Sequence, residues 1–101
     1  MQLTNEFNSI RSWAESRSLY EKGDVKTQCL KLQEEVGELA KCILKNKDTE
    51  IIDAIGDCVV VLTNLAALAG YDIEYCINSA FEEISLRTGS MQNGTFVKDA
   101  R

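Results

Sequence analysis

Histidine and proline are both absent from the 101 residues of this chain. Without histidine, serine–histidine and cysteine–histidine catalysis are excluded. A carboxylate di-iron centre, which usually needs Glu-x-x-His on bundle helices, is strongly disfavoured for the same reason. The net charge is −5, so we expect no broad electrostatic surface for nucleic acid.

Cysteine is present at four positions, but none of them forms a Cys-x-x-Cys pair. Three of the four sit among apolar residues, which is typical of small buried hydrophobes in a reducing cytosol. The spacing does not favour a zinc site. No charged segment followed by an apolar one opens the chain, and the longest apolar run, near residues 58–69, is too short to span a bilayer. The expected location is therefore cytoplasmic, with no membrane partner.

The hydrophobic period is helical nearly throughout, and a hydrophobic fraction of 45% predicts one folded domain over residues 1–101. We expect core helices over about 4–88, in four segments: 4–20, 25–45, 49–69 and 72–87. Short links between them predict an all-α, antiparallel four-helix bundle. The third helix is apolar on nearly all sides, which predicts burial against a second subunit and hence an oligomer.

Helix ends and the tail are predicted from turn residues. Asp24 is expected to cap the second helix, Asp48 or Thr49 the third, and Gly70 to follow the end of the third. In the tail, residues 89–101, the pair Asn93-Gly94 predicts a short hairpin.

Acidic residues border the apolar faces of the two central helices. Glu35 adjoins the apolar stripe of the second helix, with Lys31 and Glu38 beside it and Glu34 further toward solvent. In the third helix, polar residues fall within one sector of about 60°; they are Glu50, Asp53, Asp57 and Asn64.

A solvated face is the ordinary explanation for such acids, and it suits Glu34 and Glu50. It suits Asp53 and Asp57 poorly, because Asp57 is followed at once by "CVVVL" and aspartate is a weak helix former in mid-helix. Carboxylates brought together repel one another. A divalent cation removes that penalty, and Mg²⁺ prefers carboxylate oxygen, water and substrate phosphates.

The stretch "EEVGELA" followed by "EIIDAIGD" resembles the MazG family of all-α nucleotide pyrophosphohydrolases. The family pattern is Glu-Glu-x-x-Glu, a spacer, then Glu-x-x-Asp, and the tail "RTGSMQNGTFVK" is similar to short, single-domain members found in phages and mobile elements. The resemblance implies cleavage of a (d)NTP between its α and β phosphates, releasing a (d)NMP and pyrophosphate. It also implies Mg²⁺ as cofactor, with Mn²⁺ as a substitute, a homodimer or a homotetramer built as a dimer of dimers, and a role in nucleotide-pool house-cleaning.

Carrying the pattern over leaves one departure. Aligning Gly56-Asp57 with the usual Gly-Asp puts Ala54 where a glutamate is expected, and the literal Glu-x-x-Asp is Glu50 to Asp53. The expected metal ligands are therefore Glu35, Glu38, Asp53 and Asp57, with Glu50 as an outer candidate. Glu34 is the expected catalytic residue that orients or deprotonates the attacking water.

Other residues are expected to bind the rest of the nucleotide. Lys31, Arg87 and Lys98 would hold phosphate charge, although each has a plain surface role as its alternative. Trp13 would stack on the base, and Asn64 would bind sugar or base. Two other functions remain open: a non-catalytic helical module that sequesters a nucleotide or partner helix, and a hydrolase specific for dUTP or dCTP.

Overall fold

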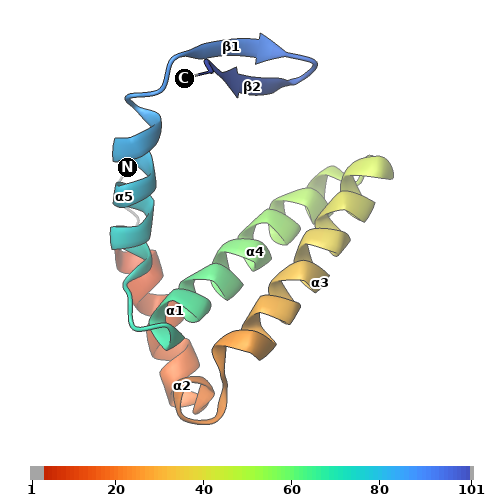
Figure 1. Ribbon diagram of the computed structural model, residues 1–101. Helices are drawn as coiled ribbons and strands as arrows, with labels where there is room; N and C mark the ends of the chain where they lie inside the picture. Colours follow the sequence, from red (N-terminus) through yellow and green to blue (C-terminus); the bar gives the residue numbers. More distant parts are fainter. Residues whose placement is uncertain (1–3, 101) are drawn as a thin grey trace.

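A computed structural model describes residues 4–100 of the chain, so the predicted outer bounds at residues 1 and 101 lie outside the described residues. The described part is mostly helical and ends in a short antiparallel hairpin, which confirms the predicted class and the hairpin (Figure 1). The elements, in chain order, are α1 (Thr4–Ser16), α2 (Leu19–Lys22), α3 (Val25–Leu44), α4 (Asp48–Leu68), α5 (Ile73–Ile84), β1 (Gly89–Gln92) and β2 (Thr95–Lys98).

The prediction of one continuous first helix over 4–20 is wrong, because α1 and α2 are two separate helices. Ser18 adopts a left-handed backbone conformation with φ of 62°, which ends α1 and lets the single turn of α2 leave in a new direction. This break matters for the site, because it brings Tyr20 of α2 against α4, where the Tyr20 hydroxyl donates to Asn64 Oδ1 at 2.6 Å.

The helices α3 and α4 lie side by side and, because a short turn joins them, run antiparallel (Figure 1). The Asp24 cap is confirmed, since its carboxylate accepts from the Thr27 backbone N–H at 2.8 Å and from the Thr27 hydroxyl at 2.9 Å. The predicted cap of the next helix is wrong. Lys47 holds that position without a side-chain hydrogen bond, and Asp48 lies inside the first turn, where the helix dipole favours a carboxylate.

The end of α4 follows the prediction. Gly70 has φ of +92°, the Tyr71 N–H donates to the Ala66 carbonyl at 2.9 Å, and the Gly70 N–H donates to the Ala67 carbonyl at 3.0 Å. These two bonds form a Schellman motif, which satisfies carbonyls that the helix would otherwise leave unpaired.

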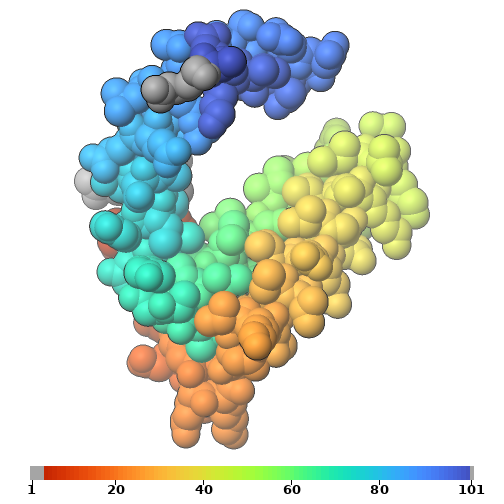
Figure 2. Space-filling view, in the orientation of Figure 1, coloured from red at the N-terminus to blue at the C-terminus, as the bar shows by residue number. Residues whose placement is uncertain are grey.

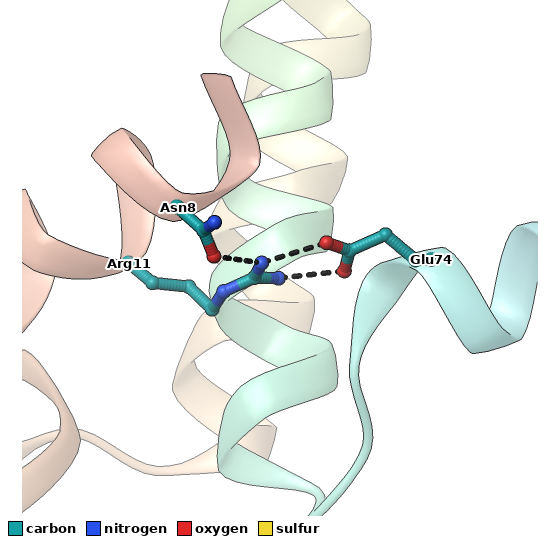
Figure 3. Close-up of polar contacts among 3 residues, drawn as sticks. All are labelled: Asn8, Arg11 and Glu74. Atoms are coloured by element: carbon teal, nitrogen blue, oxygen red, sulfur yellow. Dashed lines mark hydrogen bonds and ion pairs between the residues drawn. The ribbon is translucent and has the colours of Figure 1, made fainter. Parts of the chain in front are cut away.

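A small core joins α1, α4 and α5. Phe7, Ala66 and Ile73 are buried together there, and Ile10 and Cys76 pack against them. An ion pair supports this contact: the Arg11 guanidinium donates to both oxygens of Glu74 at 2.8 and 2.7 Å, and to Asn8 Oδ1 at 2.7 Å (Figure 3). The paired α1–α5 contact therefore combines apolar burial with a bidentate charged link.

The cysteine prediction holds fully at only one position. Cys58 is buried in α4, Cys42 and Cys76 are half-buried, and Cys29 is exposed on α3. All four thiols are free, as the prediction of a chain without a disulfide framework requires.

The tail hairpin is built on Asn93 and Gly94, which both have positive φ, 50° and 84°. This combination matches the right-handed twist of the flanking strands, so β1 and β2 pair from Gly89 opposite Lys98 to Gln92 opposite Thr95. Every residue of both strands is exposed. The hairpin therefore stands away from α3 and α4 at the end of α5 (Figure 1).

The predicted antiparallel four-helix bundle is not confirmed within one chain. α4 contacts α1, α3 and α5, but α5 and the hairpin form a separate arm, and a broad hollow separates this arm from α3 and α4 (Figure 2). The radius of gyration of 15.9 Å exceeds the roughly 13 Å of a compact domain of this length. The helices thus leave apolar surface that one chain does not cover.

One helix, α4, is long and apolar enough to cross a membrane by length and composition alone. The sequence reading of its apolar run as too short did not anticipate this, because the helix extends ten residues further toward the N-terminus than residue 58. Core helices of soluble proteins pass the same test, so the finding is only a weak indication of a membrane span.

Candidate functional site

A groove of about 360 Å³ lies where α1, α2, α3 and α4 meet. It is within the size range of small-molecule pockets. It brings together five of the ten site residues predicted from the sequence. The lining residues are Trp13, Leu19, Thr27, Gln28, Lys31, Glu35, Asp57, Val60, Val61 and Asn64.

One end of this groove is charged. Glu35 comes from α3 and has a side chain that is only 16% exposed; its Oε1 lies 3.4 Å from Lys31 Nζ. Asp57 comes from α4. Partial burial raises the pKa of the Asp57 carboxyl, the negative charges of Asp53 and Glu35 raise it further, and Lys31 opposes them. Carboxylates from two helices therefore influence one another electrostatically.

Asp53 lies one turn before Asp57 and lines a neighbouring groove of about 480 Å³ between α1 and α4. Asp57 lines both grooves, so it stands on the boundary between them. The second groove is mainly apolar and includes Phe7, Ile10 and Ile52. The two aspartates thus connect the charged end of the first groove with an apolar surface beside it.

The remaining predicted acids lie further out. Glu34 is 65% exposed at its side chain and accepts from Lys31 Nζ at 2.9 Å. Glu38 is exposed and lines neither groove. Glu50, the outer candidate, is exposed and pairs with Lys47 Nζ at 3.5 Å. The structure therefore brings Glu35 and Asp57 together and leaves Glu38 and Glu50 apart from them.

Within residues 4–100, no three acidic or cysteine side chains are placed to hold one ion as they stand. The donor set nevertheless suits Mg²⁺, which is usually bound by one or two carboxylates together with waters and substrate phosphates. Burial is the main cause of the raised Asp57 pKa, and the negative charges of Asp53 and Glu35 add a repulsion that a divalent cation would remove. Glu35 and Asp57, with Asp53 adjacent, are the residues that fit such an ion.

The rest of the groove lining, here called its aromatic end, includes Trp13 and Asn64. Trp13 is 48% exposed, and the Arg17 guanidinium carbon lies 4.6 Å from the centre of its ring. Asn64 is only 2% exposed and accepts the hydrogen bond from Tyr20. The predicted base-stacking and base- or sugar-binding residues therefore both line this groove.

Sequence reasoning missed Gln28, and it placed Tyr20 only beside Trp13, as an aromatic residue at the edge of the apolar face of the first helix. Gln28 stands three residues before Lys31 and seven before Glu35, so a helical projection of α3 could have placed it on the groove face. The partnership of Tyr20 with Asn64 had no sequence signal, because it spans 44 positions and depends on the break at Ser18.

Arg87 and Lys98 are not brought to this groove within the chain. They line a separate cavity of about 420 Å³ at the junction of α5 and the hairpin. Arg87 pairs there with Glu83 at 3.1 Å. In this structure the arm does not reach the groove of its own chain. The predicted contact of Arg87 and Lys98 with substrate phosphate would therefore require the groove of another chain.

Comparison with known proteins agrees with the geometry. Residues 24–89 match the protein family described as "MazG nucleotide pyrophosphohydrolase domain". This range includes all of α3, α4 and α5. The chain is 48% identical over 58 residues to the uncharacterized 18.2 kDa protein in the rep-hol intergenic region of Haemophilus phage HP1 (strain HP1c1). That match covers 57% of this chain but 36% of the phage protein, so the chain spans only about a third of its relative. No solved structure matches. Because the family match covers more than half of the chain, this protein belongs to the MazG nucleotide pyrophosphohydrolase domain family.

Proposed function

We propose that this protein is a Mg²⁺-dependent pyrophosphohydrolase that cleaves a (d)NTP to a (d)NMP and pyrophosphate. The observation that carries the proposal is the groove in which Glu35 and Asp57, from two helices, meet Lys31, while Trp13 and Asn64 belong to the same lining. An ion and a phosphate chain suit the charged end, and a nucleoside suits the aromatic end. The family match supports the same activity.

The charged end supplies the binding and positioning that phosphoryl chemistry needs. Glu35 and Asp57 would hold the ion, with Asp53 and Glu38 completing the predicted ligand set after side-chain adjustment. Mg²⁺, or Mn²⁺ in its place, would neutralise phosphate charge and lower the pKa of a bound water. Lys31 is positioned to bind a phosphate oxygen through Nζ, and Glu34, bonded to that same Nζ, would orient the attacking water and accept its proton.

We place this activity in the cytoplasm as nucleotide-pool house-cleaning, with the chain acting as a homodimer or a dimer of dimers. Exposed apolar residues support the assembly. A stripe on α4 contains Ile52, Ile55, Val59 and Leu62, which are 38–74% exposed. α5 carries a second stripe with Ile77, Phe81 and Ile84, each at least half exposed. Such faces are ordinarily covered by a partner.

The non-catalytic binding module remains the second candidate, and the same exposed apolar stripes are what favour it. Binding alone would not need the crowded carboxylates at Asp57 and Glu35. Replacing one of them with its neutral amide therefore separates the two functions.

The test is a panel of canonical and modified (d)NTPs with Mg²⁺, in which the products are resolved by chromatography. We expect wild type to release pyrophosphate from at least one nucleotide and Asp57→Asn to lose about 10²–10³-fold in kcat, as when a preorganised charge is removed from a site. Asp48→Asn, on the same helix but outside both grooves, is the control and should retain activity. No turnover of any nucleotide would reject the hydrolase in favour of the binding module. Equal turnover by Asp57→Asn would reject the site in which Asp57 holds the ion.

A further inference from the structure

The groove contains a buried amide whose hydrogen bonding is only partly used. Asn64 is 2% exposed, and its Oδ1 accepts the Tyr20 O–H at 2.6 Å. An asparagine amide also offers two N–H donors. In the described part of the chain, Nδ2 makes no hydrogen bond, yet no fully buried side-chain nitrogen or oxygen there lacks a partner. Nδ2 therefore keeps a small accessible area, and Asn64 is one of the residues that line the groove.

Tyr20 determines which end of the amide is available. Its hydroxyl holds the carbonyl oxygen of Asn64, so the amide presents N–H donors to the groove. Partial burial raises the pKa of the Tyr20 phenol, which keeps the hydroxyl protonated and able to donate. The lone break in the α1–α2 segment, at Ser18, is what places Tyr20 there.

The position along the groove indicates what these donors meet. Asn64 follows Asp57 by seven residues, which is two helical turns or about 10 Å along α4. Gln28 precedes Glu35 by the same seven residues on the antiparallel helix α3. Glu35 and Asp57 thus form one level of the groove and Gln28 and Asn64 another, with room for a sugar between a phosphate chain and a base.

Trp13 lies on the groove as well, and Arg17 covers one face of its indole ring. The groove therefore offers an aromatic surface, which can stack on any base. It also offers a fixed donor, which pairs only with a base that presents an acceptor. Stacking alone gives little discrimination between bases. A donor held in one orientation rewards a base that presents an acceptor and leaves other bases without a partner.

We propose that Asn64 reads the nucleobase through Nδ2 as a donor to a ring or carbonyl acceptor, and that Tyr20 is the positioning residue that fixes the amide in this orientation. This inference rests on the proposed function for the identity of the ligand as a nucleotide. In this inference the discrimination between bases depends on the orientation of the Asn64 amide, and one hydrogen bond between α2 and α4 fixes that orientation.

Trp13 is the single tryptophan of the chain, so its fluorescence reports binding at the groove without any turnover. The experiment titrates wild type, Tyr20→Phe and Asn64→Ala with the four common dNMPs and with base-free 2-deoxyribose 5-phosphate. Tyr71→Phe, an exposed tyrosine outside the groove, is the matched control. Circular dichroism checks that each variant is folded; if Asn64→Ala is not, Tyr20→Phe carries the test alone.

For the base that wild type binds best, we expect Tyr20→Phe to weaken Kd by about fivefold to tenfold, the loss associated with one hydrogen bond. The affinity for 2-deoxyribose 5-phosphate should not change, and the ranking of the bases should flatten. In turnover assays the same variant should raise KM for the preferred nucleotide and leave kcat near wild type.

An unchanged ranking in Tyr20→Phe, or an equal loss for the base-free sugar phosphate, would overturn the inference. The two proposals fail separately. If Trp13 fluorescence is quenched selectively by one base in a way that depends on Tyr20, but no nucleotide is turned over, the hydrolase is rejected and the role of Asn64 in base recognition is kept. Turnover with a base ranking that is indifferent to Tyr20 would do the reverse.

Discussion

At the scale of single residues, Lys31 links the acids of α3 to the groove. Its Nζ contacts Glu34 at 2.9 Å and Glu35 at 3.4 Å, and the hydrogen bond that it donates to Glu34 is the main reason that its pKa is raised. A lysine in this position serves two purposes. It reduces repulsion between neighbouring carboxylates, and it offers a positive charge to an incoming phosphate.

The first prediction removes that charge. Lys31→Met should raise KM for the preferred triphosphate by about tenfold to a hundredfold, the range expected when a charged hydrogen bond is lost. Affinity for the uncharged nucleoside should be unaffected, because the nucleoside lacks the phosphate contact. Kinetics and fluorescence titration measure the two effects. Lys41→Met, an exposed lysine of the same helix outside the groove, is the control; a matching loss in that variant would show a general charge effect instead.

The sequence predicted half of the site at this scale. Residues on one helix could be related by projection, which placed Lys31 beside Glu35 and Asn64 in line with Asp57. Glu38 lies near Glu35 on α3 by projection, but it is exposed and does not line the groove. Tyr20 could not be assigned, since its partner is 44 positions away.

At the scale of elements, the chain ends its helices with local chemistry that the sequence displays. The Asp24 cap, the Gly70 terminus and the Asn93-Gly94 turn were all predictable from residue type. The break at Ser18 was not, because serine is an ordinary residue for a helix and a left-handed conformation there carries no sequence mark. The contact between α2 and α4, through the Tyr20–Asn64 hydrogen bond, compensates for the unfavourable backbone conformation at Ser18.

The link between α1 and α5 gives a pH-dependent prediction. The hydrogen bond from Arg11 lowers the pKa of the Glu74 carboxyl below its ordinary value. The pair therefore stabilises the fold fully above the ordinary carboxyl pKa and loses its contribution as pH falls through the lowered value. Glu74→Gln should lower Tm by a few degrees at pH 7, and the difference from wild type should shrink toward pH 3.

Thermal unfolding followed by circular dichroism across this pH range provides the measurement. Glu82→Gln, on the exposed part of the same helix, is the control and should leave Tm near wild type at both ends. A Glu74→Gln deficit that is as large at pH 3 as at pH 7 would mean that packing, and not the ion pair of Figure 3, holds α5 against α1.

The hairpin turn gives a second prediction for an element. Gly94 has φ of +84°, so Gly94→Ala should cost about 1–2 kcal/mol locally, the penalty for an L-residue in left-handed backbone. Faster amide exchange in β1 and β2, measured by NMR, is the expected result. Gly37→Ala makes the same change in mid-α3, where an added Cβ would have open space apart from the backbone of its own helix, and should instead protect α3. Equal exchange in the hairpin of Gly94→Ala and wild type would contradict the assigned turn.

At the scale of the whole molecule, the chain has little core of its own. Its buried apolar residues are few and mostly small, and large side chains stay exposed along α3, α4, α5 and the hairpin. The radius of gyration of 15.9 Å shows the same openness. Sequence patterns predicted helices and an uncovered α4, but they could not show how the helices would be arranged, because apolar periodicity does not distinguish a neighbour in the same chain from one in a second subunit.

The last prediction follows from this uncovered surface. Light scattering coupled to size exclusion should give two or four times the 11.3 kDa chain mass, and Tm should rise with protein concentration, because association stabilises the folded form by mass action. Ile52→Lys places a charge in the apolar stripe of α4, where Ile52 is 74% exposed in the single chain. Burying an isoleucine is worth about 1.5–3 kcal/mol, so this variant should dissociate at concentrations where wild type is assembled.

Thr49→Lys is the control, because it adds the same charge at an exposed polar position of the first turn of α4, outside the stripe. It should keep the wild-type mass and concentration dependence. A wild-type monomer whose Tm is independent of concentration would contradict the assembly, since the stripe would then be stable in water without cover. Assembly that survives Ile52→Lys unchanged would move the interface to another face, with the α5 stripe around Phe81 as the next surface to test by the same substitution.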